Sequence, residues 1–425
     1  MEDTTSKKTN ILFPAYQKFY SALINLDKFN KKNDFFENIS ALDVFFSEFR
    51  NITFVLQKSM SHDADLKDIY ERLKIKYLFN DTCKWMLNKR NETTKEHPFD
   101  LEKQLLITVY TPESTMSLKS EMFTIENDTT FSSLKEQLKI FFTKLSLVEI
   151  HFSVEYRFCE KGSDKNIIDQ MMEGVRNMLL FLDAFQQEIT EDCILCSQVK
   201  EKIERLHVLV VPQEMLFNVD YLYHYIEQSF ERGSYTAILH SHIENRATLA
   251  RFDNIFGETM KDKDVFYKFI IMHLSCFKEQ RSLMPIFMIV YRDDTFTLES
   301  CAFSIRTTLY RKIHEITNRI EIEDIREIYY VAEAYSYEQD IYKQNILLPY
   351  NERVKKASKE VLIFYVVNSM LEWRSLSFDS DKMDNSDHIR SVLYSKQCES
   401  SIIPAFLNPI AATFEYLKTK KTKII

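Results

Sequence analysis

Ala41-Leu-Asp-Val-Phe-Phe-Ser-Glu-Phe-Arg-Asn-Ile-Thr-Phe-Val-Leu-Gln-Lys-Ser-Met60 sets the pattern of the N-terminal half of the chain. Its apolar residues recur every three or four positions, which places side chains on one face of a helix. Asn38 or Ser40 has the right chemistry to cap that helix. We therefore predict a helix that ends near Met60, with a core face made of Leu42, Phe45, Phe46, Phe49, Ile52, Phe54 and Val55.

The same spacing extends to both sides of this stretch. One run of this spacing covers residues 63–90, and Asp81 within it indicates that the helix can break near Asn80. We predict further helices over residues 13–29, 63–90, 167–189 and 194–211.

Between residues 105 and 158 the period changes from that of a helix to that of a strand. Residues 105–110 and 121–127 are typical of short strands, with a helix near 132–145 before the next one. Residues 148–158 alternate strictly between apolar and polar, so one face is expected in the core and the other in solvent. His151 falls on the polar side, which predicts a surface histidine.

The remaining chain predicts a second helical block and then a mixed region. LFNVDYLYHYIEQSF, which begins at Leu216, is interpreted as helical. The C-terminal third predicts a hairpin over 286–301 with its turn at 292–295, a helix over 307–320, and strands over 328–335 and 361–367.

These patterns favour a mostly helical α+β protein of several domains. A chain of 425 residues is long for a single core. We predict a helical bundle over residues 1–212 with a β insertion at about 105–158, a helical middle region over 213–280, and a C-terminal mixed α/β domain over 281–425.

Composition excludes several classes of function. The chain has only 4 glycines, at positions 162, 174, 233 and 257, so neither a phosphate-binding loop nor a dinucleotide fingerprint can be written. We therefore expect no nucleotide-fuelled enzyme and no cofactor. The net charge of −8 argues against tight, sequence-independent binding of long nucleic acid, although a local basic cleft is compatible with it.

Two pairs of residues have metal-ligand types but no completing partners. Cys193-Ile-Leu-Cys196 has metal or redox spacing without a second pair, and we interpret it as two half-buried thiols. His240-Ser-His242 is interpreted as a pair of loop histidines. The polar N-terminus and the lack of an apolar run of about 18 residues predict a cytoplasmic protein with reduced thiols and no membrane association.

Trp85-Met-Leu-Asn-Lys-Arg-Asn-Glu-Thr-Thr-Lys-Glu-His-Pro98 carries the strongest chemical signal. Positions seven apart on a helix return to within about 20° of one face, so Arg90 and His97 could point the same way, with Asn91 on the flank. Arginine can hold a phosphate, histidine can move a proton near neutral pH, and asparagine can orient either one. Lys89 and Lys95 are the predicted substrate-binding residues.

The Arg90-Asn91 pair followed after six residues by His97 resembles the active-site signature of the HEPN superfamily, whose small helical-bundle domains carry an Arg, four to six residues and a His. The resemblance covers roughly residues 14–100. It implies metal-independent cleavage of RNA in the cleft of a homodimer, often by toxins or antiphage-defence effectors with an antitoxin or other system partner. Arg90 would hold the phosphate, His97 would be the acid/base group, and Asn91 would orient them.

Two alternatives stay open. Many members of the superfamily are inactive, so the bundle could be a dimerisation or partner-binding scaffold. Asp293, Asp294 and Glu333 in the C-terminal region are the acids that a metal nuclease would use. Cleavage of RNA in EDTA separates these readings.

Overall fold

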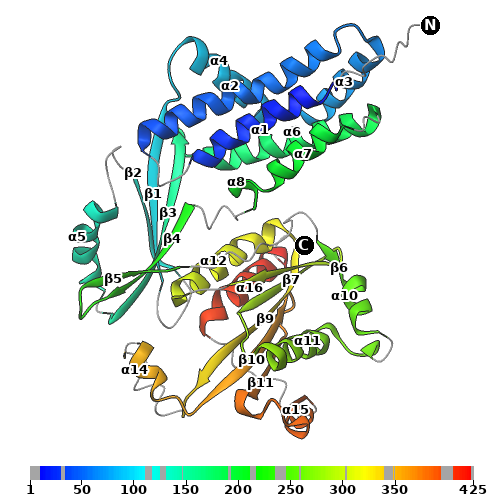
Figure 1. The fold of residues 1–425 in the computed structure, drawn as a ribbon. Coiled ribbons are helices and arrows are strands. Elements are labelled where there is room, and N and C mark those ends of the chain that lie inside the picture. The colour runs from blue at the N-terminus through cyan, green and yellow to red at the C-terminus, as the bar shows by residue number, and fades with distance from the viewer. Residues whose placement is uncertain are drawn as a thin grey trace. The chain divides into compact units, whose positions relative to one another are not determined.

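The computed structural model describes residues 10–29, 34–110, 117–124, 131–145, 147–189, 193–210, 217–234, 246–257, 260–301, 304–338, 348, 350–393 and 405–422. It is an α+β protein with two antiparallel sheets (Figure 1). The chain divides into two compact units, and divisions fall inside β1, β2, β3 and β4. The first unit comprises Met1–Leu106, Met122–Thr130 and Glu155–Asn218, and the second comprises Ile107–Glu121, Phe131–Val154 and Val219–Ile425. The predicted domain boundaries after residues 212 and 280 stay predictions.

The first unit is built around a bundle of helices with one apolar core. Its helices are α1 (Phe13–Lys28), α2 (Phe35–Ser59), α3 (Ala64–Tyr77), α4 (Asp81–Lys95), α6 (Ile167–Ile189), α7 (Ile194–Glu204) and α8 (His207–Val210). The predicted break at Asn80 is confirmed, because the Asn80 side chain accepts from the Cys83 amide at 2.8 Å and starts α4 there. The predicted single helix over 194–211 is interrupted after Glu204.

Helix α2 ends at Ser59, close to the predicted Met60, but its N-cap and one of its core residues differ from the prediction. Asp34, not Asn38 or Ser40, caps it, and its Oδ1 accepts from the Phe36 amide at 2.8 Å. All three residues can cap, so the choice depends on how far the helix can extend toward its N-terminus. Phe54, predicted in the core, is 57% exposed. The other predicted core residues of α2 are buried or half-buried.

A close approach of two helices fixes the position of α4. Gly174 lies on α6, and a Cβ atom added there would sit 2.0 Å from Met86 Sδ on α4. Met86 is itself buried, so α4 packs directly against the α6 backbone at this glycine. The missing side chain therefore makes room for the helix that carries Arg90.

The first sheet has five strands in the order β2-β1-β3-β4-β5. These strands are β1 (Leu101–Tyr110), β2 (Ser117–Thr124), β3 (Glu149–Glu160), β4 (Asn218–His224) and β5 (Ser229–Arg232), and α5 (Phe131–Phe142) lies between β2 and β3 in the chain. The predicted helix LFNVDYLYHYIEQSF is wrong, since it forms β4 and β5. Its Val, Tyr and Phe residues suit a strand, and antiparallel pairing with a neighbour decides between the two periods.

Strand β3 is buried on both faces in its first half, contrary to the predicted alternation. His151 is 3% exposed, and its Nδ1 lies 3.0 Å from Thr307 Oγ1. Ser153 Oγ lies 3.0 Å from the Tyr110 hydroxyl. The predicted surface histidine is therefore wrong, because partners distant in sequence cover the polar face.

The second sheet has six strands in the order β11-β10-β9-β7-β8-β6. Its strands are β6 (Ala247–Thr248), β7 (Ile286–Tyr291), β8 (Thr295–Ser300), β9 (Ile325–Ser336), β10 (Lys359–Asn368) and β11 (Trp373–Asp379). The predicted hairpin is confirmed as β7 and β8, and the predicted strands at 328–335 and 361–367 as β9 and β10.

Helices cover both faces of this sheet and bury a separate core on each (Figure 1). One face carries α10 (Leu249–Phe256), α11 (Val265–Gln280) and α15 (Ser386–Leu393), and the other carries α12 (Arg306–Ile322) and α16 (Asn408–Thr422). The short α14 (Tyr350–Val354) precedes β10 in the chain. Within the described ranges, no helix is both long and apolar enough to span a bilayer.

Candidate functional site

The residues of the HEPN-like signature lie at the end of α4, but they do not share one helix. Arg90 and Asn91 belong to the last two turns of α4, which ends at Lys95. His97 follows the helix and precedes Pro98, and a proline disfavours the helical conformation of the residue before it. The predicted two-turn register between Arg90 and His97 is therefore wrong, and any meeting of their side chains depends on the turn after α4.

Arg90 is half-buried, and its side chain contacts that of its neighbour Asn91. Its Nη1 donates to Asn91 Oδ1 at 3.1 Å. Its Nε is buried and makes no hydrogen bond. Across the described ranges of the chain, no carboxylate forms an ion pair with Arg90. The guanidinium thus retains positive charge that no carboxylate of the described residues neutralises, and an anion could pair with it.

Lys89, the neighbouring basic residue, has the opposite environment. It is buried, and its Nζ pairs with Glu92 at 2.7 Å and with Glu160 at the end of β3. Burial lowers the pKa of Lys89, but its hydrogen bonds to Glu160 and Glu92 outweigh that effect and the pKa is raised. Trp85 Nε1 also donates to Glu160, at 3.4 Å. Lys89 therefore attaches α4 to β3.

His97 and Lys95 are both exposed. His97 Nδ1 lies 2.9 Å from the carbonyl oxygen of Pro98. A hydrogen bond there requires Nδ1 to carry the proton, which leaves the lone pair of the neutral ring on Nε2. The nitrogen that could exchange a proton with a substrate is then Nε2. Lys95 is the member of the predicted lysine pair whose charge faces solvent.

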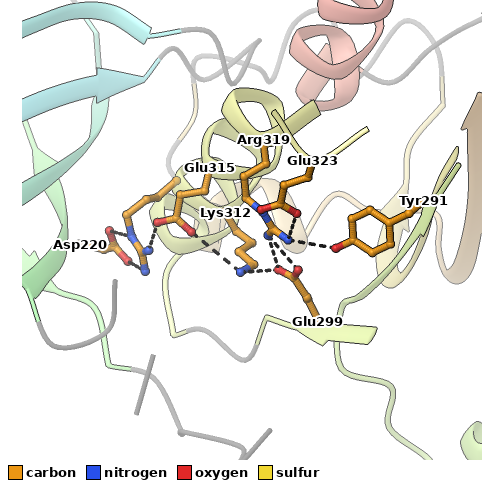
Figure 2. Close-up of polar contacts among 8 residues, drawn as sticks. Asp220, Tyr291, Glu299, Lys312, Glu315, Arg319 and Glu323 are labelled. Atoms are coloured by element: carbon orange, nitrogen blue, oxygen red, sulfur yellow. Dashed lines mark hydrogen bonds and ion pairs between the residues drawn. The ribbon is translucent and has the colours of Figure 1, made fainter. Parts of the chain in front are cut away.

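A cluster of paired charges in the second unit lies along α12 (Figure 2). Arg311 pairs with buried Asp220 of β4 at 2.9 Å, and Lys312 pairs with Glu299 of β8 at 2.6 Å. Arg319 contacts Glu299 and Glu323, each at 2.8 Å, and also the Tyr291 hydroxyl at 3.3 Å. Each of these cations has a carboxylate partner, so the cluster joins α12 to β4 and β8.

The acids of the metal-nuclease alternative are engaged separately. Asp294 pairs with Arg326 at 2.6 Å, Asp293 lies 4.0 Å from Arg246, and Glu333 accepts from the Leu283 amide. Among the described residues, no three or more His, Cys, Asp or Glu side chains come together in a group that could hold a metal.

Of the two residue pairs with metal-ligand side chains, the structure describes the cysteine pair but not the histidine pair. Cys193 caps α7, where its Sγ accepts from the Cys196 amide at 3.2 Å, and both thiols are buried, not half-buried. His240 and His242 lie outside the described residues.

The sequence patterns did not identify two acids, one that holds α4 and one that holds the turn after it. Glu160 binds Lys89 and Trp85, and Asp43 of α2 accepts from the Phe99 amide at 3.1 Å. An acid inside the apolar pattern of residues 41–60 was a signal for Asp43, whereas nothing local marked Glu160. No protein-family model, curated protein or solved structure matches the chain.

Proposed function

We propose that the protein is a metal-independent endoribonuclease of the HEPN type that acts as a homodimer, as a toxin or an antiphage-defence effector. The observation that carries the proposal is Arg90, a half-buried arginine with an unused Nε and no carboxylate partner within the described residues. An arginine in that state is suited to bind a phosphate of the RNA backbone.

In this proposal Arg90 holds the scissile phosphate and Asn91 fixes the guanidinium. His97 exchanges a proton through Nε2. The 2′-hydroxyl of RNA is the nucleophile: its proton passes to His97 Nε2 as its oxygen bonds to phosphorus, the bond from phosphorus to the 5′-oxygen breaks, and Nε2 returns the proton to the 5′-oxygen. A single Arg and a single His provide little positive charge to bind the phosphate. Two copies facing each other would double the positive charge around the phosphate.

The test is cleavage of single-stranded RNA by the purified full chain in EDTA, with light scattering at the same micromolar concentration. We expect cleavage by a dimer, and a loss of about a hundredfold or more in rate for His97→Ala and for Arg90→Ala. His62→Ala and Arg205→Ala are matched controls, because both residues are exposed and lie elsewhere in the first unit.

Full activity in His97→Ala, or a wild-type chain that is monomeric and inert, would contradict the proposal. An inert dimer would favour the scaffold alternative. Specific support for that alternative comes from α2, where Phe36 and Phe54 are 69% and 57% exposed and could contact a partner. Cleavage that requires Mg²⁺ would point instead to the C-terminal acids.

A further inference from the structure

The turn that carries His97 is attached to α2 at two neighbouring positions. The Phe99 amide donates to Asp43 Oδ1 at 3.1 Å. The Phe99 ring stacks on Phe46, with ring centroids 5.5 Å apart. Asp43 and Phe46 are three residues apart on one helix and therefore lie on the same face. The backbone after α4 is held in place by one hydrogen bond and one ring contact from the same element.

Asp43 is an unusual carboxylate for a structural role alone. It is half-buried, and no Lys or Arg in the described part of the chain forms an ion pair with it. Burial raises the pKa of Asp43, and the Phe99 amide and the nearby His97 lower it in part. A carboxylate taken partly out of water without a basic partner is costly, and the Phe99 amide, two residues after His97, offsets part of this cost by donating to it.

We propose that Asp43 is a positioning residue for His97, which fixes the turn through the Phe99 amide and places a negative charge beside the imidazole during proton transfer. This inference rests on the proposed function, since it assigns His97 its partner in that reaction. While the 2′-oxygen bonds to phosphorus, Nε2 takes a proton and the ring becomes positively charged. A carboxylate close to the ring stabilises that positive charge at the moment it forms.

Two substitutions separate the hydrogen bond from the charge. Asp43→Asn keeps an oxygen that can accept from the Phe99 amide but removes the charge. Asp43→Ala removes both. We compare the full-length proteins by amide hydrogen exchange at Phe99, by the NMR signals of the His97 ring at one fixed pH, and by kcat and KM for RNA. Asp68→Asn, which changes an exposed acid on α3, is the matched control.

In Asp43→Ala we expect faster exchange at Phe99, shifted His97 ring signals and a lower kcat. In Asp43→Asn we expect near wild-type exchange at Phe99, shifted ring signals, and a kcat lowered about tenfold with KM unchanged, because the proton-transfer step alone is weakened. A purely structural aspartate would leave the ring signals and kcat of the Asn variant at wild-type values.

The outcomes also separate this inference from the proposed function. If the wild-type chain cleaves no RNA, the proposed function is wrong, and the exchange and ring signals still decide whether Asp43 positions His97. Unchanged exchange at Phe99 in the Ala variant would overturn the role in the turn. Unchanged His97 signals in the Asn variant would overturn the role of the charge, whatever the effect on stability.

Discussion

Arg319 on α12 and Arg90 on α4 show two uses of the same side chain. Arg319 contacts Glu299, Glu323 and the Tyr291 hydroxyl (Figure 2). Arg90 contacts Asn91, and within the described residues no carboxylate pairs with it. Arg319 is paired with two carboxylates, whereas Arg90 retains a positive charge that no carboxylate of the described residues neutralises. Pairing, more than exposure, therefore distinguishes an arginine that holds structure from one available to an anion.

Loss of the buried ion pair between Asp220 and Arg311 should have the largest effect on stability. Asp220 is 0% exposed and accepts two hydrogen bonds from Arg311. Asp220→Asn leaves a buried guanidinium without its main charge partner. We expect it to lower the free energy of unfolding by about 3 kcal/mol or more, as measured by urea denaturation. Glu71→Ala is the control, because the Lys74–Glu71 pair is exposed and should contribute about 1 kcal/mol or less. Equal losses in the two variants would remove the distinction between the two kinds of pair.

A second prediction concerns pH and the buried histidine of β3. Burial, with Arg306 and Arg353 nearby, lowers the pKa of His151 to about 3. In the unfolded chain the histidine binds its proton at an ordinary pKa of about 6.5. The unfolded state therefore binds more protons between pH 6.5 and 3, and this part of the stability is lost as the pH falls through that window.

We expect this single group to account for about 1.4 kcal/mol per pH unit inside the window. The measurement is urea unfolding at pH 7 and 5.5 for wild type and for His151→Gln, which has no titrating ring. The wild type should lose more stability on acidification. His273, whose pKa is lowered to about 4 by burial, is present in both proteins and cancels. The same loss in both would mean that His151 keeps an ordinary pKa in the fold.

The smallest effect on stability is expected at Arg90. Since no carboxylate in the described part of the chain pairs with it, Arg90→Ala should change the free energy of unfolding by about 0.5 kcal/mol or less. Arg319→Ala should cost clearly more, because it leaves Glu299 and Glu323 without a shared partner. Thermal unfolding of the two variants side by side checks the order. A loss at Arg90 as large as that at Arg319 would make Arg90 a structural residue.

Sequence patterns predicted the features that neighbouring residues determine. The start of α4 at Asn80 and the β7–β8 hairpin follow from a capping side chain and from local alternation. Features that depend on distant partners were missed. The burial of His151 depends on Thr307, which lies 156 residues away. The ion pair of Lys89 depends on Glu160, which lies 71 residues away.

The candidate site was predicted in part for the same reason. The residue types at positions 90, 91 and 97 could be read locally, and the contact between Arg90 and Asn91 follows from their adjacency. Pro98 marked locally that the helix ends before His97, but the path of the turn that carries His97 depends on Asp43 and Phe46 of α2. Asp43 and Glu160, which hold the two sides of this region, belong to α2 and β3 and enter only through the fold.

The attachment of α4 to β3 also sets an order in time during synthesis. Lys89 and Glu160 are 71 residues apart, and ribosomes add roughly 5–20 residues per second. Dividing 71 by those rates gives roughly 4 to 14 s between the synthesis of the two residues. During that interval Lys89 can pair with Glu92 inside its own helix but not with β3. A nascent chain therefore exposes α4 to the cell well before the strand that anchors it has been made.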